Sequence, residues 1–323
     1  MPVDHGRGRT MFDLIRRFLS LIATLLLVSI LTFLAFAVIP GDPVTLILGT
    51  EATPDRVEVL RHQLGLDSPL PARYAAWIGG LVQGNPGTSI RYDAPVGELI
   101  AARLPVTAWL AVLSLGFILV LTLPASLLGV LRQGRMSDRI LGTLLMLSIS
   151  VPGFFLGILI LWFFGIVLGV FQPGGYVPYD KDFAGFLRYL AFPALAIALP
   201  NAAVLVKFLR TSAIGQMKAD YVRTARSKGS SEHRLILAHV LRNAVIPVVP
   251  LLGMVVAETF AGTILVEQVF GLPGLGRLLT ASITSRDFPL VESLVMLIAV
   301  VVVVANFMSD VLMQVLDPRI RVR

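Results

Sequence analysis

The most informative segment of the chain is basic and lies between two apolar spans: Asp220-Tyr221-Val222-Arg223-Thr224-Ala225-Arg226-Ser227-Lys228-Gly229. From position 207 to position 242 the chain carries eight Lys or Arg residues and only two acids, Asp220 and Glu232. Short basic loops of membrane proteins stay on the cytoplasmic side. Residues 207–242, called the basic loop below, are therefore predicted to face the cytoplasm, and their charges indicate a docking surface.

Composition places the chain in a membrane. Hydrophobic residues make up 56% of its 323 positions and charged residues only 15%, and the mean hydropathy is +0.82, which predicts a polytopic membrane protein. The net charge is +7, but the basic residues sit at the ends of apolar spans and not on one face, which argues against a nucleic-acid partner. With no cysteine and four scattered histidines, no metal site is predicted.

Six stretches are long and apolar enough to cross a bilayer, which takes about 20 residues per helix. The first follows four arginines and could be a secretory signal, but it is longer than a signal core and lacks a small-x-small cleavage site, so a retained helix is predicted. The six are residues Leu19–Ile39, Leu104–Leu131, a tract within Ile140–Tyr179, Arg188–Lys207, Asn243–Val266 and Leu290–Ser309.

The uncharged tract Ile140–Tyr179 is long enough to cross once or twice. Two crossings would put the basic loop outside, against the inward bias of basic loops. One tilted helix ending near Phe171 keeps the loop inside and is the prediction. Both termini then face the cytoplasm, and 18 of the 27 Lys and Arg residues lie on that side.

This topology divides the chain into four parts. Residues 1–39 form the cytoplasmic N-terminus and first helix, 104–316 the transmembrane core, and 317–323 a cytoplasmic tail. Residues 40–103 form an extracytoplasmic loop whose seven prolines exclude one long helix. Short helices are predicted at 54–64 and 72–82, within a small ordered cap.

The basic loop itself has the pattern of two helices joined by a bend. The first is predicted to continue from the fourth span to Lys228, and Gly229 permits the bend. Ser230 or Ser231 can cap the second helix, with Glu232 in its first turn. Helical spacing places Leu237, Val240, Leu241 and Ala244 on one face, opposite His239 and Arg242.

That second helix has two interpretations. In one, its apolar face packs on the membrane domain while residues 230–235 enter a groove on another protein. In the other, it is a basic amphipathic helix resting on anionic lipid.

A known motif separates these two interpretations. The run Arg223-Thr224-Ala225-x-x-x-Gly229, followed at the required spacing by Leu241, resembles the cytoplasmic EAA loop of ABC importer permeases. Arg223, Thr224, His239 and Arg242 depart from the general pattern. The run Tyr-Val-Arg-Thr-Ala-Arg-x-Lys-Gly is similar to the form typical of the dipeptide, oligopeptide and nickel permease branch.

Three further segments resemble the same branch, so the resemblance extends from about Phe12 to Arg321. They are an outer-loop segment at Leu64–Tyr74 with Trp77 after it, an outer turn at Val266–Arg277, and the tail Leu316–Arg321. The resemblance implies an all-α protein with six transmembrane helices, the type I ABC importer transmembrane fold, in a bacterial inner membrane.

The resemblance also implies function and partners. No Gly-Lys-Ser/Thr phosphate loop is present, so the chain is expected to be a transport subunit with no cofactor of its own, and ATP and Mg are expected in separate ATPase subunits. Implied partners are a second homologous permease, two ATPases and an extracytoplasmic substrate-binding protein. Residues expected to contact the ATPase are Arg223, Thr224, Ala225, Gly229, Ser230, Ser231, Glu232, His233 and Leu235. The cargo implied is di- and oligopeptides, with nickel chelates, glutathione or another small solute as the alternative.

Two residues are candidates for the pathway. Glu258 is the only carboxylate well inside a predicted span, so it is expected to face a pathway or a partner; the alternative is a buried structural carboxylate. Pro152 could be a gating kink or a static one. A secondary transporter would show acid or His pairs in several spans and inverted repeats, and an intramembrane enzyme would show catalytic pairs; the chain has neither pattern.

Overall fold

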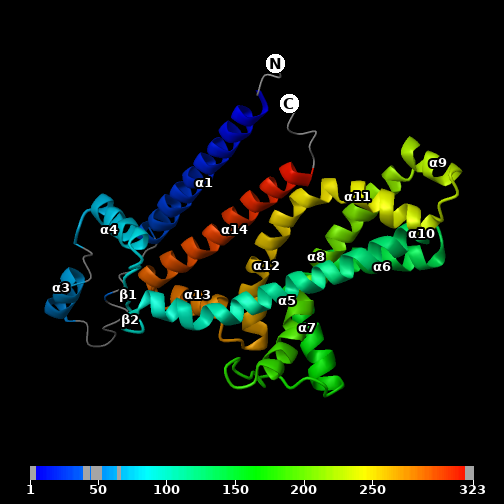
Figure 1. Ribbon diagram of the computed structural model, residues 1–323. Coiled ribbons are helices and arrows are strands. Elements are labelled where there is room, and N and C mark those ends of the chain that lie inside the picture. Colours follow the sequence, from blue (N-terminus) through cyan, green and yellow to red (C-terminus); the bar gives the residue numbers. More distant parts are fainter. Residues whose placement is uncertain (1–4, 39–43, 45–52, 64–66, 317–323) are drawn as a thin grey trace. The chain divides into compact units, whose positions relative to one another are not determined.

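A computed structural model describes residues 5–38, 44, 53–63 and 67–316 of the chain (Figure 1). The chain divides into two compact units, which are described separately below. Unit 1 comprises Met1–Leu14, Ala108–Leu272 and Val304–Arg323, and unit 2 comprises Ile15–Thr107 and Pro273–Val303.

Five helices are long and apolar enough to cross a membrane, and they confirm five of the six predicted spans. Most run past the predicted limits, because a helix continues beyond the apolar window that locates it. Helix α5, for example, begins eight residues earlier than predicted and carries Glu98 and Arg103 in its first turns. The five are α1 (His5–Val38), α5 (Val96–Leu131), α8 (Phe183–Gln216), α12 (Val249–Phe270) and α14 (Phe288–Leu316). The predicted end of the first span, Ile39, lies outside the described residues.

The third tract is not the single tilted helix that was predicted. It forms α6 (Met136–Ser150), then α7 (Gly153–Ile160) continued by a π-helix, η2 (Leu161–Val167), and the two parts are bent by 107°. The cause is Pro152, which keeps the preceding residue out of the α region. Val151 accordingly adopts φ −98° and ψ 123° and ends α6.

The bent pair contacts α8 along much of its length. Its start lies at the C-terminal end of α8, where Asp138 forms an ion pair of 2.8 Å with Arg210. Its second part lies nearer the N-terminal end of α8, where the ring centroids of Phe164 and Phe192 are 5.0 Å apart. Eighteen residues of α8 separate these contacts, about 27 Å at 1.5 Å per residue, close to the hydrocarbon thickness of about 30 Å. A broken span and a re-entrant loop both have this geometry, so the single crossing stays a prediction.

Helix α8 is the centre of unit 1 and packs against α6, α7 and α12 (Figure 1). Pro193 and Pro200 lie inside it without ending it. Gly157 lets α7 approach α12 closely, because a Cβ at this position would lie 3.2 Å from the ring of Phe270. The buried core of unit 1 also includes residues from α5, α8, α12 and the basic loop, among them Ile118, Leu205, Leu209, Val222, Leu235, Val240 and Val255.

Unit 2 contains the two short helices that the sequence predicts between the first and second spans. Helices α3 (Pro54–Gln63) and α4 (Leu70–Val82) confirm the two short helices, although Leu64 lies outside the described residues. Helix α13 (Leu275–Thr284) and a short antiparallel hairpin, β1 (Thr88–Ser89) and β2 (Ala94–Pro95), were not predicted. The hairpin is held by the buried carboxylate of Asp287, which accepts hydrogen bonds from the Ser89 hydroxyl and from the amides of Ile90, at 3.1 Å, and Arg91, at 3.3 Å.

Candidate functional site

The basic loop is built from short helices and is not the two-helix arrangement that was predicted. Helix α8 ends at Gln216, and α9 (Asp220–Ser227) begins after a turn, so the predicted continuous helix to Lys228 is wrong. Ala219 takes an extended conformation, with ψ 150°, and Asp220 lies in the first turn of α9, where a negative charge favours a new helix start. The chain then continues through α10 (Glu232–Leu235), the π-helix η3 (Ile236–Val240), α11 (Leu241–Ala244) and a 3-10 turn, η4 (Ile246–Val248), into α12.

Gly229 provides the bend, as predicted, with φ +81°. Its amide donates to the Arg226 carbonyl at 3.0 Å, and the next amide, that of Ser230, donates to the Ala225 carbonyl at 3.3 Å. These two bonds form a Schellman motif, which requires a left-handed residue at the position of Gly229. A Cβ there would meet no atom within 4 Å, so backbone conformation and not space selects glycine.

The start of α10 is fixed by an ion pair and not by the predicted serine cap. Ser231 occupies the cap position, but its side chain makes no capping hydrogen bond. Glu232 lies in the first turn of α10, as predicted, and its carboxylate accepts two hydrogen bonds from the Arg226 guanidinium, at 2.9 and 3.3 Å. This bidentate pair connects α9 to α10 across the bend.

The buried face of the loop differs from the predicted one at two leucines. Leu237 is 54% exposed, so placing it on the packed face was wrong, whereas Leu235 is fully buried. The π-helix η3 has more residues per turn than an α-helix and shifts the packed face toward Leu235 and Ile236. Leu235 therefore packs in the core of unit 1 and is not accessible to a partner.

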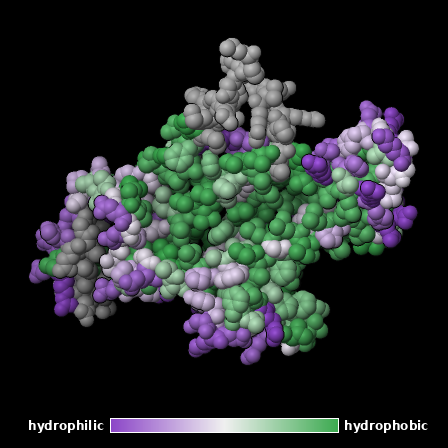
Figure 2. Space-filling view, viewed as in Figure 1, coloured by the Kyte–Doolittle hydropathy of each residue, from purple (hydrophilic) through white to green (hydrophobic). Residues whose placement is uncertain are grey.

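The opposite face of the loop is exposed and charged. The Arg223 side chain is 81% exposed, and Thr224, Ser231, Glu232 and His233 are also exposed. Ala225 and Ser230 are half-buried. Figure 2 shows hydrophilic residues gathered over α9 and α10. Among the predicted contact residues, the exposed ones thus share one surface that is fixed from beneath by buried Val222 and Leu235.

A clamp behind the loop was missed by sequence reasoning. Arg210, near the end of α8, donates to Asp138 at 2.8 Å and to the Gly129 carbonyl at 3.4 Å. Asp138 also accepts from the Gly134 amide at 3.0 Å. The clamp joins the ends of α5, α6 and α8, which are adjacent to the basic loop. No local pattern indicates it, because its two charged residues are 72 positions apart.

Glu258 lies on the exposed side of α12. It shares that side with Met254 and Leu265, which are 40% and 50% exposed and lie at helical spacing from it. The buried side of the helix carries Thr259 and Thr263, whose hydroxyls donate to carbonyls of their own helix. Glu258 is therefore not buried within this chain, and its place in a pathway or against a partner stays a prediction. Pro152, the second predicted pathway residue, lies at the bend between α6 and α7.

Comparison with known proteins assigns the chain to a family. The sequence model of the family described as "binding-protein-dependent transport system inner membrane component" matches residues 121–322, and the model of its N-terminal region matches residues 11–111. A protein of Brucella abortus strain 2308 described as a peptide transport system permease is 37% identical over 308 residues, covering 95% of this chain and 98% of that protein. The glutathione transport system permease protein GsiC of Escherichia coli strain K12 is 38% identical over 307 residues, with the same coverage of both chains.

Proposed function

Since this chain belongs to the family of binding-protein-dependent transport system inner membrane components and is a permease subunit of an ABC importer, we propose that it forms half of a pathway for di- and oligopeptides. A second, homologous permease completes that pathway, and two ATPase subunits drive it. An extracytoplasmic binding protein delivers the cargo. The complex is located in a bacterial inner membrane, with both termini of this chain in the cytoplasm.

The basic loop is proposed as the element that receives work from the ATPases. The observation that carries this proposal is its two-sided structure: one face, with Val222 and Leu235, is buried in unit 1, and the other presents exposed charges. Holding a thousandfold gradient takes about 4 kcal/mol per molecule, so the transmitting element must be stiff. The Gly229 motif and the Arg226 to Glu232 pair provide that stiffness, and rigid-body movement of the loop would move α8 and α12 with it.

ATP and Mg bind to the partner subunits in this proposal. Around the bend, between positions 220 and 235, the exposed side of the loop carries four basic residues, Arg223, Arg226, Lys228 and Arg234, against the acids Asp220 and Glu232. Such a surface favours an acidic groove on the partner, because complementary charges steer docking and fix its register. The same residues resting on anionic lipid would need no groove, and loss of partner binding on charge reversal distinguishes the two.

The cargo proposal draws on the named functions of relatives. One relative is described as a peptide transport permease, and another is named for glutathione, which is itself a tripeptide. Peptides are therefore the proposed cargo class, with glutathione as its nearest specific member and nickel chelates as the alternative. Glu258, on the exposed side of α12, is proposed to line the pathway, since a charge at that depth requires a polar neighbour or water.

Copurification tests the proposal. The tagged full-length chain, extracted from its native membrane in mild detergent, is expected to bring with it a second permease and two ATPase subunits. Vesicles containing that complex and the binding protein should accumulate labelled dipeptide only when ATP is present, and vesicles without ATP are the control. Uptake by the purified chain alone, driven by an ion gradient, would overturn the assignment in favour of a secondary transporter.

A further inference from the structure

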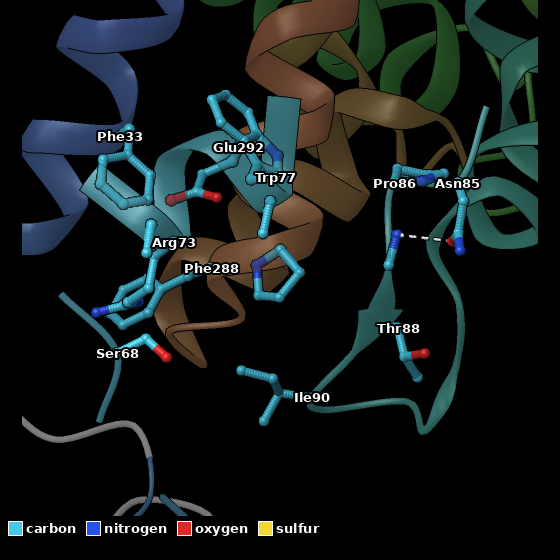
Figure 3. A pocket seen from close by; sticks show the side chains of 14 residues that line it. Phe33, Ser68, Arg73, Trp77, Asn85, Pro86, Thr88, Ile90, Phe288 and Glu292 are labelled. Carbon is cyan, nitrogen blue, oxygen red and sulfur yellow. Dashed lines mark hydrogen bonds between the residues drawn. The ribbon is translucent and has the colours of Figure 1, made fainter. Parts of the chain in front are cut away.

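Unit 2 contains a pocket of about 660 Å³, and its lining includes no residue of the basic loop and not Glu258. Its walls come from α1, α4, the segment that leads into β1, and the first turn of α14. Three aromatic side chains line it: Phe33, Trp77 and Phe288. Figure 3 shows Phe33, Trp77, Arg73 and Glu292 grouped on one side, with Asn85 and Thr88 on the segment that leads into and forms β1 across from them.

A nearly buried carboxylate, that of Glu292, faces this pocket. Glu292 is only 8% exposed and lines the pocket wall. Among the described residues it forms no ion pair and no hydrogen bond through its side chain. A buried carboxylate without compensation is destabilising. The Glu292 carboxylate thus forms part of the pocket wall, where it is available to a positive or hydrogen-bonding group of a ligand.

The pocket also contains one cation, Arg73, whose charge acts on Glu292 without a direct salt bridge between the two. The guanidinium of Arg73 lies over the Phe33 ring, 5.9 Å from its centroid, and it forms no salt bridge with Glu292. The two charges are thus separate within one cavity. A simple cation would be repelled by Arg73, and a simple anion would be repelled by Glu292.

From this arrangement we infer that the pocket binds a small zwitterion, a free amino acid or dipeptide, with its ammonium group at Glu292 and its carboxylate at Arg73. The aromatic rings cover the apolar part of the ligand, and Phe33 and Trp77 also favour an ammonium group through their π faces. A bidentate guanidinium is well suited to the carboxylate. The available volume lies within the ordinary range of small-ligand pockets, about 300–1,000 Å³.

This inference goes beyond the proposed transport function. The site belongs to unit 2 of the permease itself, and binding there needs neither ATP nor the binding protein. Failure of the binding experiment below would leave the copurification result untouched, and failure of copurification would leave this site untouched. The two proposals are therefore tested separately.

The test uses the full-length chain in nanodiscs of phosphatidylglycerol, which has no zwitterionic headgroup. Binding of alanyl-alanine is measured by saturation-transfer NMR and competition. N-acetyl-alanyl-alanine, which lacks the ammonium group, and alanyl-alanine amide, which lacks the carboxylate, are each expected to bind about tenfold more weakly or worse. Equal binding of all three peptides, or no binding of alanyl-alanine, would overturn the inference.

Two substitutions assign the charges. Glu292→Gln is expected to abolish the preference for the free ammonium group, and Arg73→Gln the preference for the free carboxylate. Glu98→Gln and Arg188→Gln, at exposed positions outside the pocket, are matched controls that should leave both preferences unchanged. Circular dichroism checks that each variant keeps its helix content. The three-peptide comparison on the unaltered chain decides the question even where a variant does not fold.

A lipid headgroup with an ammonium and a phosphate presents similar chemistry. The competition is therefore repeated in nanodiscs that contain phosphatidylethanolamine. Unchanged dipeptide binding supports a soluble zwitterion as the occupant. Complete loss of dipeptide binding would assign the pocket to the lipid and overturn the inference.

Discussion

Gly229 bends the basic loop in a left-handed conformation, with φ +81°, that other residues adopt at a cost. Gly229→Ala is expected to destabilise the bend by about 1 kcal/mol, and Gly229→Asn by less, because asparagine tolerates this conformation. Gly229→Pro should abolish transport, since proline fixes φ near −65° and removes the amide that bonds to Arg226. The measurement is dipeptide uptake and coupled ATP hydrolysis by the reconstituted complex.

The control for that series is Gly142→Ala. Gly142 lies inside α6 without a positive φ, and a Cβ added to it would meet no atom within 4 Å, so alanine should be tolerated there. Membrane insertion should be intact in every variant. Undiminished uptake by the proline variant would show that the bend is not needed to couple ATP hydrolysis to transport.

Glu258 is the charged residue on the exposed side of α12. Glu258→Gln keeps its size and removes its charge, and it is expected to change the uptake rate or the preference between cationic and anionic dipeptides, because a pathway carboxylate acts on passing charges. Competition uptake with lysine-containing and glutamate-containing dipeptides measures this. Glu98→Gln, at an exposed position in the first turn of α5, is the comparison. Identical kinetics for both variants would remove Glu258 from the pathway.

Helices α5, α6 and α8 are held together by the clamp of Asp138 and Arg210. Asp138→Asn should weaken it by about 1–2 kcal/mol, because the Asp138 side chain is only 10% exposed and takes part in two hydrogen bonds. The expected result is faster hydrogen exchange at the ends of α6 and α8. Asp220→Asn, which breaks the exposed pair with Arg223, should leave exchange at the ends of α6 and α8 unchanged. Equal exchange in both variants would mean that the clamp has no structural role.

The long apolar helices could be predicted because length and hydropathy are local properties of the chain. For the same reason Gly229 could be identified as a bend, since a positive φ favours one residue type. The angle of the bend at Pro152, 107°, could not be predicted from the sequence. Its angle depends on how α7 packs, with Gly157 against Phe270 and Ala196, and these neighbours are distant in sequence.

Contacts between distant residues account for what sequence reasoning missed. Asp138 and Arg210 are 72 positions apart, and Ser89 and Asp287 are 198 apart. The π-helix at Ile236–Val240 likewise places Leu235 on the packed face in place of the predicted Leu237. No local sequence pattern predicts that π-helix. The sequence does show Glu292 as a carboxylate just inside an apolar run. Its burial in the wall of a pocket is visible only in the folded chain.

The orientation of the chain in the membrane leads to a further prediction, which the absence of cysteine makes simple to test. Helix α8 has 34 residues and is about 51 Å long, more than the hydrocarbon thickness of about 30 Å, so its ends lie on opposite sides of the membrane. Its N-terminal end is capped by Asp182, which accepts from the Gly185 amide at 2.9 Å. Its C-terminal end leads into the basic loop.

Single cysteines at exposed positions should therefore react from opposite sides. With a membrane-impermeant thiol reagent, Asp180→Cys is expected to be labelled in intact spheroplasts, because it precedes the N-terminal end of α8. Arg132→Cys and Lys228→Cys should be labelled only in inverted vesicles, because the clamp places the end of α5 beside the C-terminal end of α8 and basic residues are retained in the cytoplasm. The cysteine-free parent provides a zero background. Labelling of Lys228→Cys from outside would reverse the topology and remove the basic loop from any cytoplasmic ATPase.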